Sequence, residues 1–350
     1  DLPSYQWEHN QVHWREGRLS TQYRNRPPFH ELLGTRLPGD VDENPRWRNI
    51  LRADEVHWLR DHRFQGQIII PAAAYCMMAV GAAQSLSKNV PIEAIEITDL
   101  DFENAITVPD GPPGAEVLFN LHQTHTQDGS NKSVIQAEDT CFSGPADGSA
   151  PFKSIFTGKL SVFLDSSMGT GLPAKSKIRP ILYPMNVDDF YDQMKSIGLN
   201  YSGSFRGIQA AQRRLYNSTI RIDPPEEGDG SFLIHPTTLD VCFQAIFAAY
   251  ASPDDGSLQT SFLPRKIGRI LFTIPECQAS LAAKSSVSVD AVVTNVVTAN
   301  TFQLPALCGD LHVFNEKTGQ MQILIEDLSV SSFAVGSEND DRQLFLEDRW

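Results

Sequence analysis

A pattern that occurs twice constrains the fold of this chain more than any other feature of its sequence. The first copy covers residues 58–79 and the second covers residues 232–250. In each copy a short apolar segment leads through a proline, Pro71 or Pro236, into a long apolar stretch, and the two prolines lie 165 residues apart. Proline is favoured at the first helical position, because its missing N–H would be unpaired there anyway. The repeat therefore predicts two similar halves, each built around one buried helix.

The polar residues of the two copies differ. The first copy contains the spacing H-x-x-x-G-x-x-x-x-P, which begins at His62, so a histidine precedes the N–H-exposing end of a predicted helix, where negative charge is stabilised. The second copy carries Asp240 where the first has Tyr75, with Gln244 one turn later on the same face. An aspartate in so apolar a helix is costly unless it is paired or used. One copy thus offers a base and the other an acid, although a histidine before a core helix can also be a packed or capping residue.

The alternation of apolar and polar residues predicts many strands and few helices outside the repeat. Strands are expected at residues 30–37, 47–53, 94–108, 115–126, 133–142, 152–164, 262–273, 279–297, 308–315 and 320–333, and a short helix at residues 187–197. The segment 67–70 is expected to be an extended entry into the first helix.

Together these motifs resemble the dehydratase domain of a polyketide synthase, in particular the fungal, highly reducing, iterative type. The second motif reads H-P-x-x-L-D-x-x-x-Q from His235, and three further stretches agree, namely P-F-H-E-L-L-G at 28–34, G-L-N-Y-S-G-S-F-R-G at 198–207 and L-P-R-K-I-G-R-I at 263–270. The resemblance implies an α+β fold called a double hotdog, in which two hotdog folds are fused and each wraps an antiparallel sheet around a long central helix.

This resemblance also divides the chain. Residues 1–27 resemble a linker from a preceding domain, residues 28–165 form the N-terminal hotdog and residues 181–335 form the C-terminal hotdog. Residues 166–180, rich in Ser, Gly, Pro and Lys, are the expected linker between the hotdogs, and residues 336–350 lead to the next domain.

The implied reaction is dehydration of a 3-hydroxyacyl thioester on an acyl carrier protein to the 2,3-enoyl thioester. His62 is expected to remove the C2 proton and Asp240 to protonate the departing hydroxyl. No dissociable cofactor and no metal are expected, because the carrier protein holds the substrate on its phosphopantetheine arm. The carrier and the other domains of the same synthase are the implied partners, and a homodimer is left open.

Several other residues are expected to bind the substrate at the first helix. The N–H of Ala72, after Pro71, is expected to stabilise the thioester oxygen, although the family often has glycine there. Gly66 is expected to let the backbone approach the acyl chain, and the alternative is a plain turn glycine.

Two more site residues come from the second half. Tyr201 resembles the tyrosine of the family's loop beside the active site, and its hydroxyl is expected to contact the substrate or the catalytic pair. Ser204 stands where the family commonly has proline. Gln244 is expected to hold Asp240 by a hydrogen bond. The alternatives are a core aromatic for Tyr201 and a polar residue at the seam between the halves for Gln244.

Composition excludes several other functions. The net charge of −14 argues against nucleic acid or an anionic membrane as a partner. The five cysteines include no C-x-x-C pair, and neither a signal peptide nor a membrane-spanning run is present, so a reduced cytoplasmic protein is expected. An acidic carrier protein would need basic residues for docking, and Arg206, Arg213 and Arg214 are candidates. The alternatives to a dehydratase are a product-template cyclase, which shares the double hotdog, and a catalytically silent scaffold.

Overall fold

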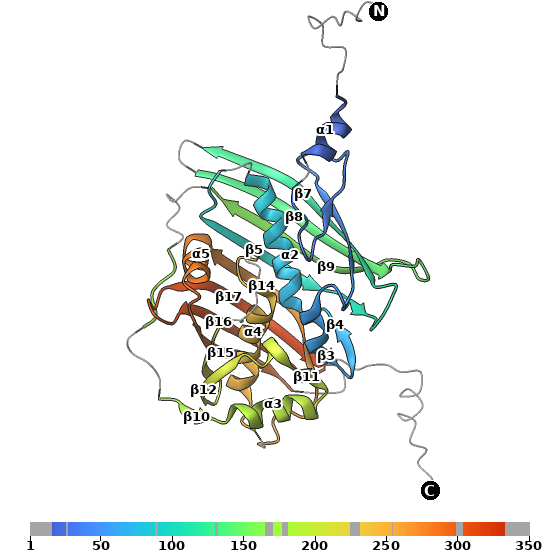
Figure 1. Cartoon of the computed structure of the whole chain (residues 1–350). Coiled ribbons are helices and arrows are strands. Elements are labelled where there is room, and N and C mark those ends of the chain that lie inside the picture. The colour runs from blue at the N-terminus through green and yellow to red at the C-terminus, as the bar shows by residue number, and fades with distance from the viewer. Residues whose placement is uncertain are drawn as a thin grey trace, which may run out of the picture.

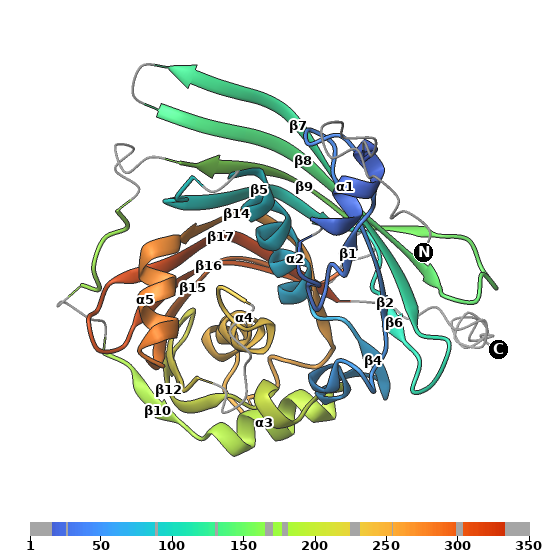
Figure 2. The ribbon, with the colours of Figure 1, turned by 45° about the horizontal axis from the view of Figure 1, so that its top comes forward.

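Two long buried helices lie on the concave side of one curved antiparallel sheet (Figures 1 and 2). They are α2 (Ala72–Gln84) and α4 (Pro236–Tyr250), the two helices that the repeat predicts. The computed structural model describes residues 16–25, 27–87, 90–129, 132–164, 171–176, 181–224, 232–253, 255–298 and 304–332. Both helices are buried on nearly all sides, which explains why neither has a long polar face.

The large sheet has thirteen strands within the described residues. In spatial order they are β1 (Thr35–Arg36), β2 (Arg46–Leu51), β7 (Ala115–Gly129), β8 (Lys132–Pro145), β9 (Lys153–Phe163), β5 (Ala94–Phe102), β14 (Phe262–Thr273), β17 (Met321–Ser332), β16 (Ala306–Asn315), β15 (Val287–Val297), β13 (Asn217–Ile222), β12 (Ile208–Arg214) and β10 (Tyr183–Met185).

The first six strands in that order come from the first half of the chain and the other seven from the second half. The halves join where β5 pairs antiparallel with β14, for example with Thr98 opposite Arg269. Each half therefore wraps one core helix, and the two half-sheets form a continuous surface (Figure 2). This arrangement confirms the predicted double hotdog.

A smaller sheet crosses between the halves. Its order is β11 (Leu199–Tyr201), β3 (His62–Phe64), β4 (Gln67–Ile69) and β6 (Thr107–Val108). Strand β11 belongs to the second half of the chain, whereas the other three belong to the first half. Within the described residues, the remaining helices are α1 (Arg18–Arg24), α3 (Val187–Ser196) and α5 (Ile274–Ala282), with 3-10 turns η1 (His57–Asp61), η2 (Ser85–Ser87) and η4 (Gly203–Phe205).

Four local predictions need correction. The expected strand at 94–108 is two strands, β5 and β6, which belong to different sheets. Pro71 is the N-cap of α2, with ψ at 150°, and not its first helical residue, whereas Pro236 is the first residue of α4. The expected strand at 279–297 begins only at Val287, because α5 occupies residues 274–282 and its Pro275 has no N–H to offer a sheet. Most of the expected strand at 30–37 is a turn that ends at Gly34, whose φ of +76° suits glycine.

The linker between the halves is described only at residues 171–176, where Lys175 forms an ion pair with Asp290 at 2.8 Å and lies over the ring of Phe314. The predicted terminal linker at 336–350, and residues 1–15 of the other, lie outside the described residues. All five cysteines are free, and four of them are buried. None of the described helices is both long and apolar enough to span a membrane.

Candidate active site

The H-x-x-x-G spacing builds a tight hairpin that orients His62. Strands β3 and β4 are joined by Gln65 and Gly66, whose φ angles of +48° and +83° are both positive, as a type I′ turn requires. The hairpin brings the carbonyl oxygen of Ile69 to 2.8 Å from His62 Nδ1. Gly66 has this turn role and does not line the cavity described below, so its alternative interpretation fits the geometry better.

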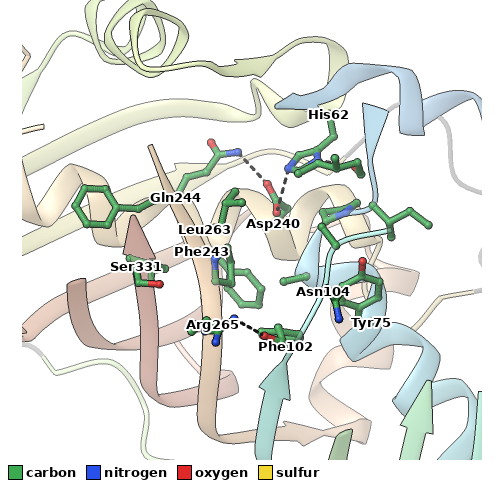
Figure 3. Close-up of a pocket in the computed structure, with 18 of the residues that line it drawn as sticks. His62, Tyr75, Phe102, Asn104, Asp240, Phe243, Gln244, Leu263, Arg265 and Ser331 are labelled. Carbon is green, nitrogen blue, oxygen red and sulfur yellow. Dashed lines mark hydrogen bonds and ion pairs between the residues drawn. The ribbon is translucent and has the colours of Figure 1, made fainter. Parts of the chain in front are cut away.

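The hydrogen bond to Ile69 defines which nitrogen of His62 faces the site. A carbonyl oxygen only accepts hydrogen bonds, so Nδ1 carries the hydrogen and Nε2 presents its lone pair in the neutral ring. Nε2 lies 4.0 Å from Asp240 Oδ1, and both side chains are buried (Figure 3). The two residues come from opposite halves of the chain. The structure thus brings together the histidine and the aspartate that the sequence analysis selected.

Asp240 lies one turn into α4, and Gln244 holds its second oxygen. Gln244 Nε2 donates to Asp240 Oδ2 at 3.2 Å and to the carbonyl oxygen of Phe205 at 3.1 Å. Burial raises the pKa of Asp240, while the charge of His62 and the hydrogen bond from Gln244 lower it in part. Asp240 therefore retains its proton to a higher pH than an exposed aspartate, which suits a proton donor.

Tyr201 is held beside His62 by the small sheet. Strands β11 and β3 pair antiparallel with Tyr201 opposite His62, and the two rings are 5.6 Å apart. Phe205 packs on the His62 ring at 5.0 Å. Burial, followed by the nearby charge of Asp240, raises the pKa of the Tyr201 phenol, so its hydroxyl stays protonated. Tyr201 lines the same cavity as the pair.

A cavity of about 130 Å³ opens next to the pair, and most of its wall is apolar (Figure 3). Besides the residues already named, its wall includes Ile70, Pro71, Ala72, Tyr75, Phe102, Phe243, Phe247, Phe262, Leu263, Pro264, Arg265 and Ser331. Residues 263–265 open the L-P-R-K motif, and four of the five stretches that suggested the family contribute to this wall. Such a cavity suits a mostly hydrocarbon substrate with one polar reacting end.

The start of α2 forms part of the wall of this cavity. The first N–H groups of a helix have no partner within the helix, and here the N–H of Ala74 already bonds the carbonyl oxygen of Pro71 at 2.9 Å. Ala72, the first helical residue, lines the cavity. A helix N-terminus is in general a favourable place for an oxygen that gains negative charge.

Two tyrosines near the site were not predicted from the sequence. The hydroxyl of Tyr75 accepts the N–H of Ile106 at 3.0 Å, and its ring stacks on Phe156. Tyr75 occupies the position of the repeat that matches Asp240, and this match could have indicated that it lies near the site. Tyr191, on α3, contacts Gln244 through its hydroxyl at 3.1 Å, and no motif pointed to it.

His235 and the arginines expected to dock a carrier protein make local contacts in the structure. His235 is the N-cap of α4, and its Nδ1 accepts the N–H of Thr237. Arg213 donates to the carbonyl oxygens at the end of α4, beginning with Ala248 at 2.8 Å, while Arg206 forms an ion pair with Asp188. Within the described ranges, no group of three or more His, Cys, Asp or Glu side chains is arranged to hold a metal ion.

Comparison with known families identifies the kind of protein. Residues 30–135 match the family model described as polyketide synthase dehydratase domain, and residues 173–340 match the one described as polyketide synthase dehydratase N-terminal domain.

Similar curated proteins are fungal synthases. The chain is 39% identical to the PKS-NRPS hybrid synthetase psoA of Aspergillus fumigatus and 36% identical to the reducing polyketide synthase BOA6 of Botryotinia fuckeliana, in both cases over the whole chain. It is 32% identical to the highly reducing polyketide synthase ACTTS3 of Alternaria alternata. The chain spans only 9% of psoA and 14% of BOA6 and ACTTS3.

Solved structures agree on the fold. The dehydratase domain from the CurF module of curacin polyketide synthase superposes with a TM-score of 0.67 at 17% identity, covering 88% of this chain and all of that one. The dehydratase domain of PpsC from Mycobacterium tuberculosis, solved with C12:1-CoA, gives a TM-score of 0.61 at 15% identity, covering 87% of this chain and all of that one. The family models, the fungal relatives and the fold agree, and the chain belongs to the polyketide synthase dehydratase family.

Proposed function

We propose that this domain eliminates water from a 3-hydroxyacyl thioester with His62 as the base and Asp240 as the acid, giving the 2,3-enoyl thioester. The observation that supports these roles most strongly is the pairing of an imidazole lone pair with a buried carboxyl group, 4.0 Å apart beside an apolar cavity. Each group has the form that its step needs, because Nε2 is free to accept a proton and burial favours the protonated carboxyl.

The elimination breaks two bonds of the substrate and forms one. His62 Nε2 accepts the proton from C2, and the electron pair left behind forms the C2–C3 double bond. The bond from C3 to its hydroxyl breaks, and Asp240 gives its proton to that oxygen, which leaves as water. A proton then passes from the imidazolium of His62 to the carboxylate of Asp240, and this transfer restores both groups for the next turnover.

Negative charge develops on the thioester oxygen while the C2 proton leaves. The N–H of Ala72 at the start of α2 is proposed to donate a hydrogen bond to this oxygen, with the helix N-terminus adding a favourable field. Pro71 fixes the entry of the chain into the helix, and the hydroxyl of Tyr201 is proposed to contact the substrate beside His62.

The substrate is proposed to arrive on the phosphopantetheine arm of an acyl carrier protein, so no dissociable cofactor takes part. The fungal relatives are large synthases of which this chain matches about a tenth, which supports a partnership with other domains of one synthase. We assign residues 28–165 and 181–335 to the two hotdogs and residues 166–180 to the linker between them.

The test supplies the 350-residue chain with 3-hydroxyacyl thioesters in a series from about C4 to C10 and follows the loss of one water by mass spectrometry. The expected product is the 2,3-enoyl thioester, and an Asp240→Asn variant serves as the negative control. Absence of the enoyl product from every wild-type reaction would contradict the proposal. Ring closure of a poly-β-keto thioester without dehydration would identify a product-template cyclase, and no reaction with either substrate would indicate a scaffold.

A further inference from the structure

A buried tyrosine on α3 contacts the amide that holds the acid. Tyr191 is 4% exposed, and its hydroxyl lies 3.1 Å from Gln244 Oε1. The other end of the same amide bonds Asp240 and the carbonyl oxygen of Phe205. Tyr191 therefore lies one residue away from the acid in a continuous hydrogen-bonded chain.

Counting hydrogens determines the direction of each bond in this chain. The backbone N–H of Ile208 donates to the Tyr191 hydroxyl oxygen at 3.2 Å, so the hydroxyl has one proton left to donate. Its two acceptors in reach are Gln244 Oε1 at 3.1 Å and the carbonyl oxygen of Phe205 at 3.3 Å. Phe205 already receives a hydrogen from Gln244 Nε2. In the described part of the chain, Tyr191 is the one donor recorded for Gln244 Oε1.

The orientation of the Gln244 amide decides where Asp240 carries its proton. In the observed orientation Nε2 donates to Asp240 Oδ2, so the acidic proton sits on Oδ1, the oxygen nearest His62. If the amide turned over, its oxygen would face Oδ2 and would favour a proton there, directed at Gln244 and away from the reacting groups. It would also face the carbonyl oxygen of Phe205, leaving two acceptors in contact.

We propose that Tyr191 is a positioning residue, whose hydroxyl holds the Gln244 amide in the orientation that keeps the acidic proton of Asp240 on Oδ1. A partly exposed arginine packs on the Tyr191 ring. The Arg206 guanidinium lies 4.9 Å from the ring centre and forms an ion pair with Asp188 at 3.0 Å. Burial raises the pKa of Tyr191 well above its ordinary value, so the hydroxyl remains a donor at working pH. This inference rests on the proposed roles of His62 and Asp240.

The test compares the wild-type chain with Tyr191→Phe, which removes only the hydroxyl, and with Tyr183→Phe, the same change at an exposed tyrosine on β10. Tyr191→Phe is expected to lower kcat roughly 3- to 10-fold, the effect of one neutral hydrogen bond, with KM changed less than about twofold. The N–H of Gln244 that donates to Asp240 is then less firmly held, so the pKa of Asp240 should rise. The alkaline limb of the kcat–pH profile, which reports this acid, should therefore move to higher pH. Tyr183→Phe should match the wild type in both measurements.

Combining Tyr191→Phe with Gln244→Ala distinguishes positioning of the Gln244 amide from general loosening of the fold. If Tyr191 acts through Gln244, then Tyr191→Phe should cause no further loss of kcat in a Gln244→Ala background. Thermal unfolding of all variants identifies any that fail to fold, and the comparison in the Gln244→Ala background uses only folded protein. An unchanged kcat and pH profile in Tyr191→Phe, or equal losses in both backgrounds, would overturn the inference while wild-type dehydration stands. A wild type without enoyl product would instead overturn the proposed function, and this inference with it.

Discussion

Helices α2 and α4 occupy equivalent places in the two halves, yet they meet the cavity with different side chains. Tyr75 and Ala79 of α2 match Asp240 and Gln244 of α4, each pair 165 residues apart. The histidines before the helices also differ, since His62 faces the cavity whereas the histidine before α4 caps its helix. Each half thus contributes one of the two proposed reacting groups, and neither half contains a complete site.

The two halves also differ in the surroundings of a buried carboxyl group, Asp139 in the first half and Asp240 in the second. Asp240 has Gln244 and His62 beside it, but Asp139 on β8 has no hydrogen-bond partner of good geometry for either oxygen within the described residues. Burial raises the pKa of Asp139 to about 7, while nearby backbone N–H groups lower it in part. Of these two buried aspartates, Asp240 has a histidine from the other half of the chain beside it, and its reacting role is the one proposed above.

The largest effect is expected from removing the base. His62→Ala should lower kcat for dehydration by about 10²–10⁴-fold, because it removes the proposed base, and a positioned acid–base group typically contributes that much. Folding should be nearly intact, since the variant loses one hydrogen bond to Ile69, worth about 1 kcal/mol. The measurements are turnover of a 3-hydroxyacyl thioester and the free energy of unfolding.

The control is the histidine that directly precedes the core helix of the other half. His235→Ala should reduce the free energy of unfolding by about 0.5–2 kcal/mol through loss of the helix cap and should keep turnover. Near-normal turnover in His62→Ala would show that His62 is structural and would remove the distinction between the two histidines.

The second effect comes from the acid. Asp240→Asn keeps the shape of the side chain but provides no proton of comparable acidity, so substrate binding should persist while turnover falls by about 10²-fold or more. Gln244→Ala should weaken activity only modestly, by loosening Asp240. Kinetics and substrate-binding measurements on both variants check this order. If Asp240→Asn turned over normally, the proton would have to come from Tyr201 or water.

The smallest expected effect is on folding stability and comes from Asp139, the buried carboxyl group of the first half. With a folded pKa of about 7 and an unfolded value near 4, Asp139 binds its proton more tightly in the folded state. The pH-dependent loss of folding stability caused by Asp139 is therefore absent below about pH 4, grows as the pH rises between the two pKa values, and is complete above about pH 7. The titratable groups that interact with Asp139 are the thiols of Cys76 on α2 and Cys141 on β8. Burial raises the pKa of both thiols, so neither becomes charged between about pH 4 and pH 7.

Asp139→Asn should remove this dependence. The stability difference between variant and wild type should grow in favour of the variant from about pH 4 to pH 8, reaching roughly 2–4 kcal/mol. Denaturant unfolding across that range measures it, with turnover as a check that the site is undisturbed. Parallel stability profiles for the two proteins would show that Asp139 has an ordinary pKa.

The two core helices and the histidine–aspartate pair could be predicted from the sequence, because both depend on local sequence patterns. The matched prolines gave the two core helices, and the spacing around His62 and Asp240 identified the pair. The features that were missed depend on contacts between distant segments. Pairing of β5 with β14, and of Tyr201 with His62, joins strands far apart in the chain and leaves no periodic signal. Tyr191 was missed because a hydrogen bond across elements has no sequence spacing.

The central claim is that His62 and Asp240, one from each half, act together in a single reaction. A cycle of His62→Ala, Asp240→Asn and the double variant tests it most directly, with kcat for dehydration as the measurement. If each single variant loses about 10³-fold, groups acting as a unit predict a double variant within about tenfold of the slower single one. A double variant slower by the product of the two effects, about 10⁶-fold, would show that the residues act independently and would contradict the shared site.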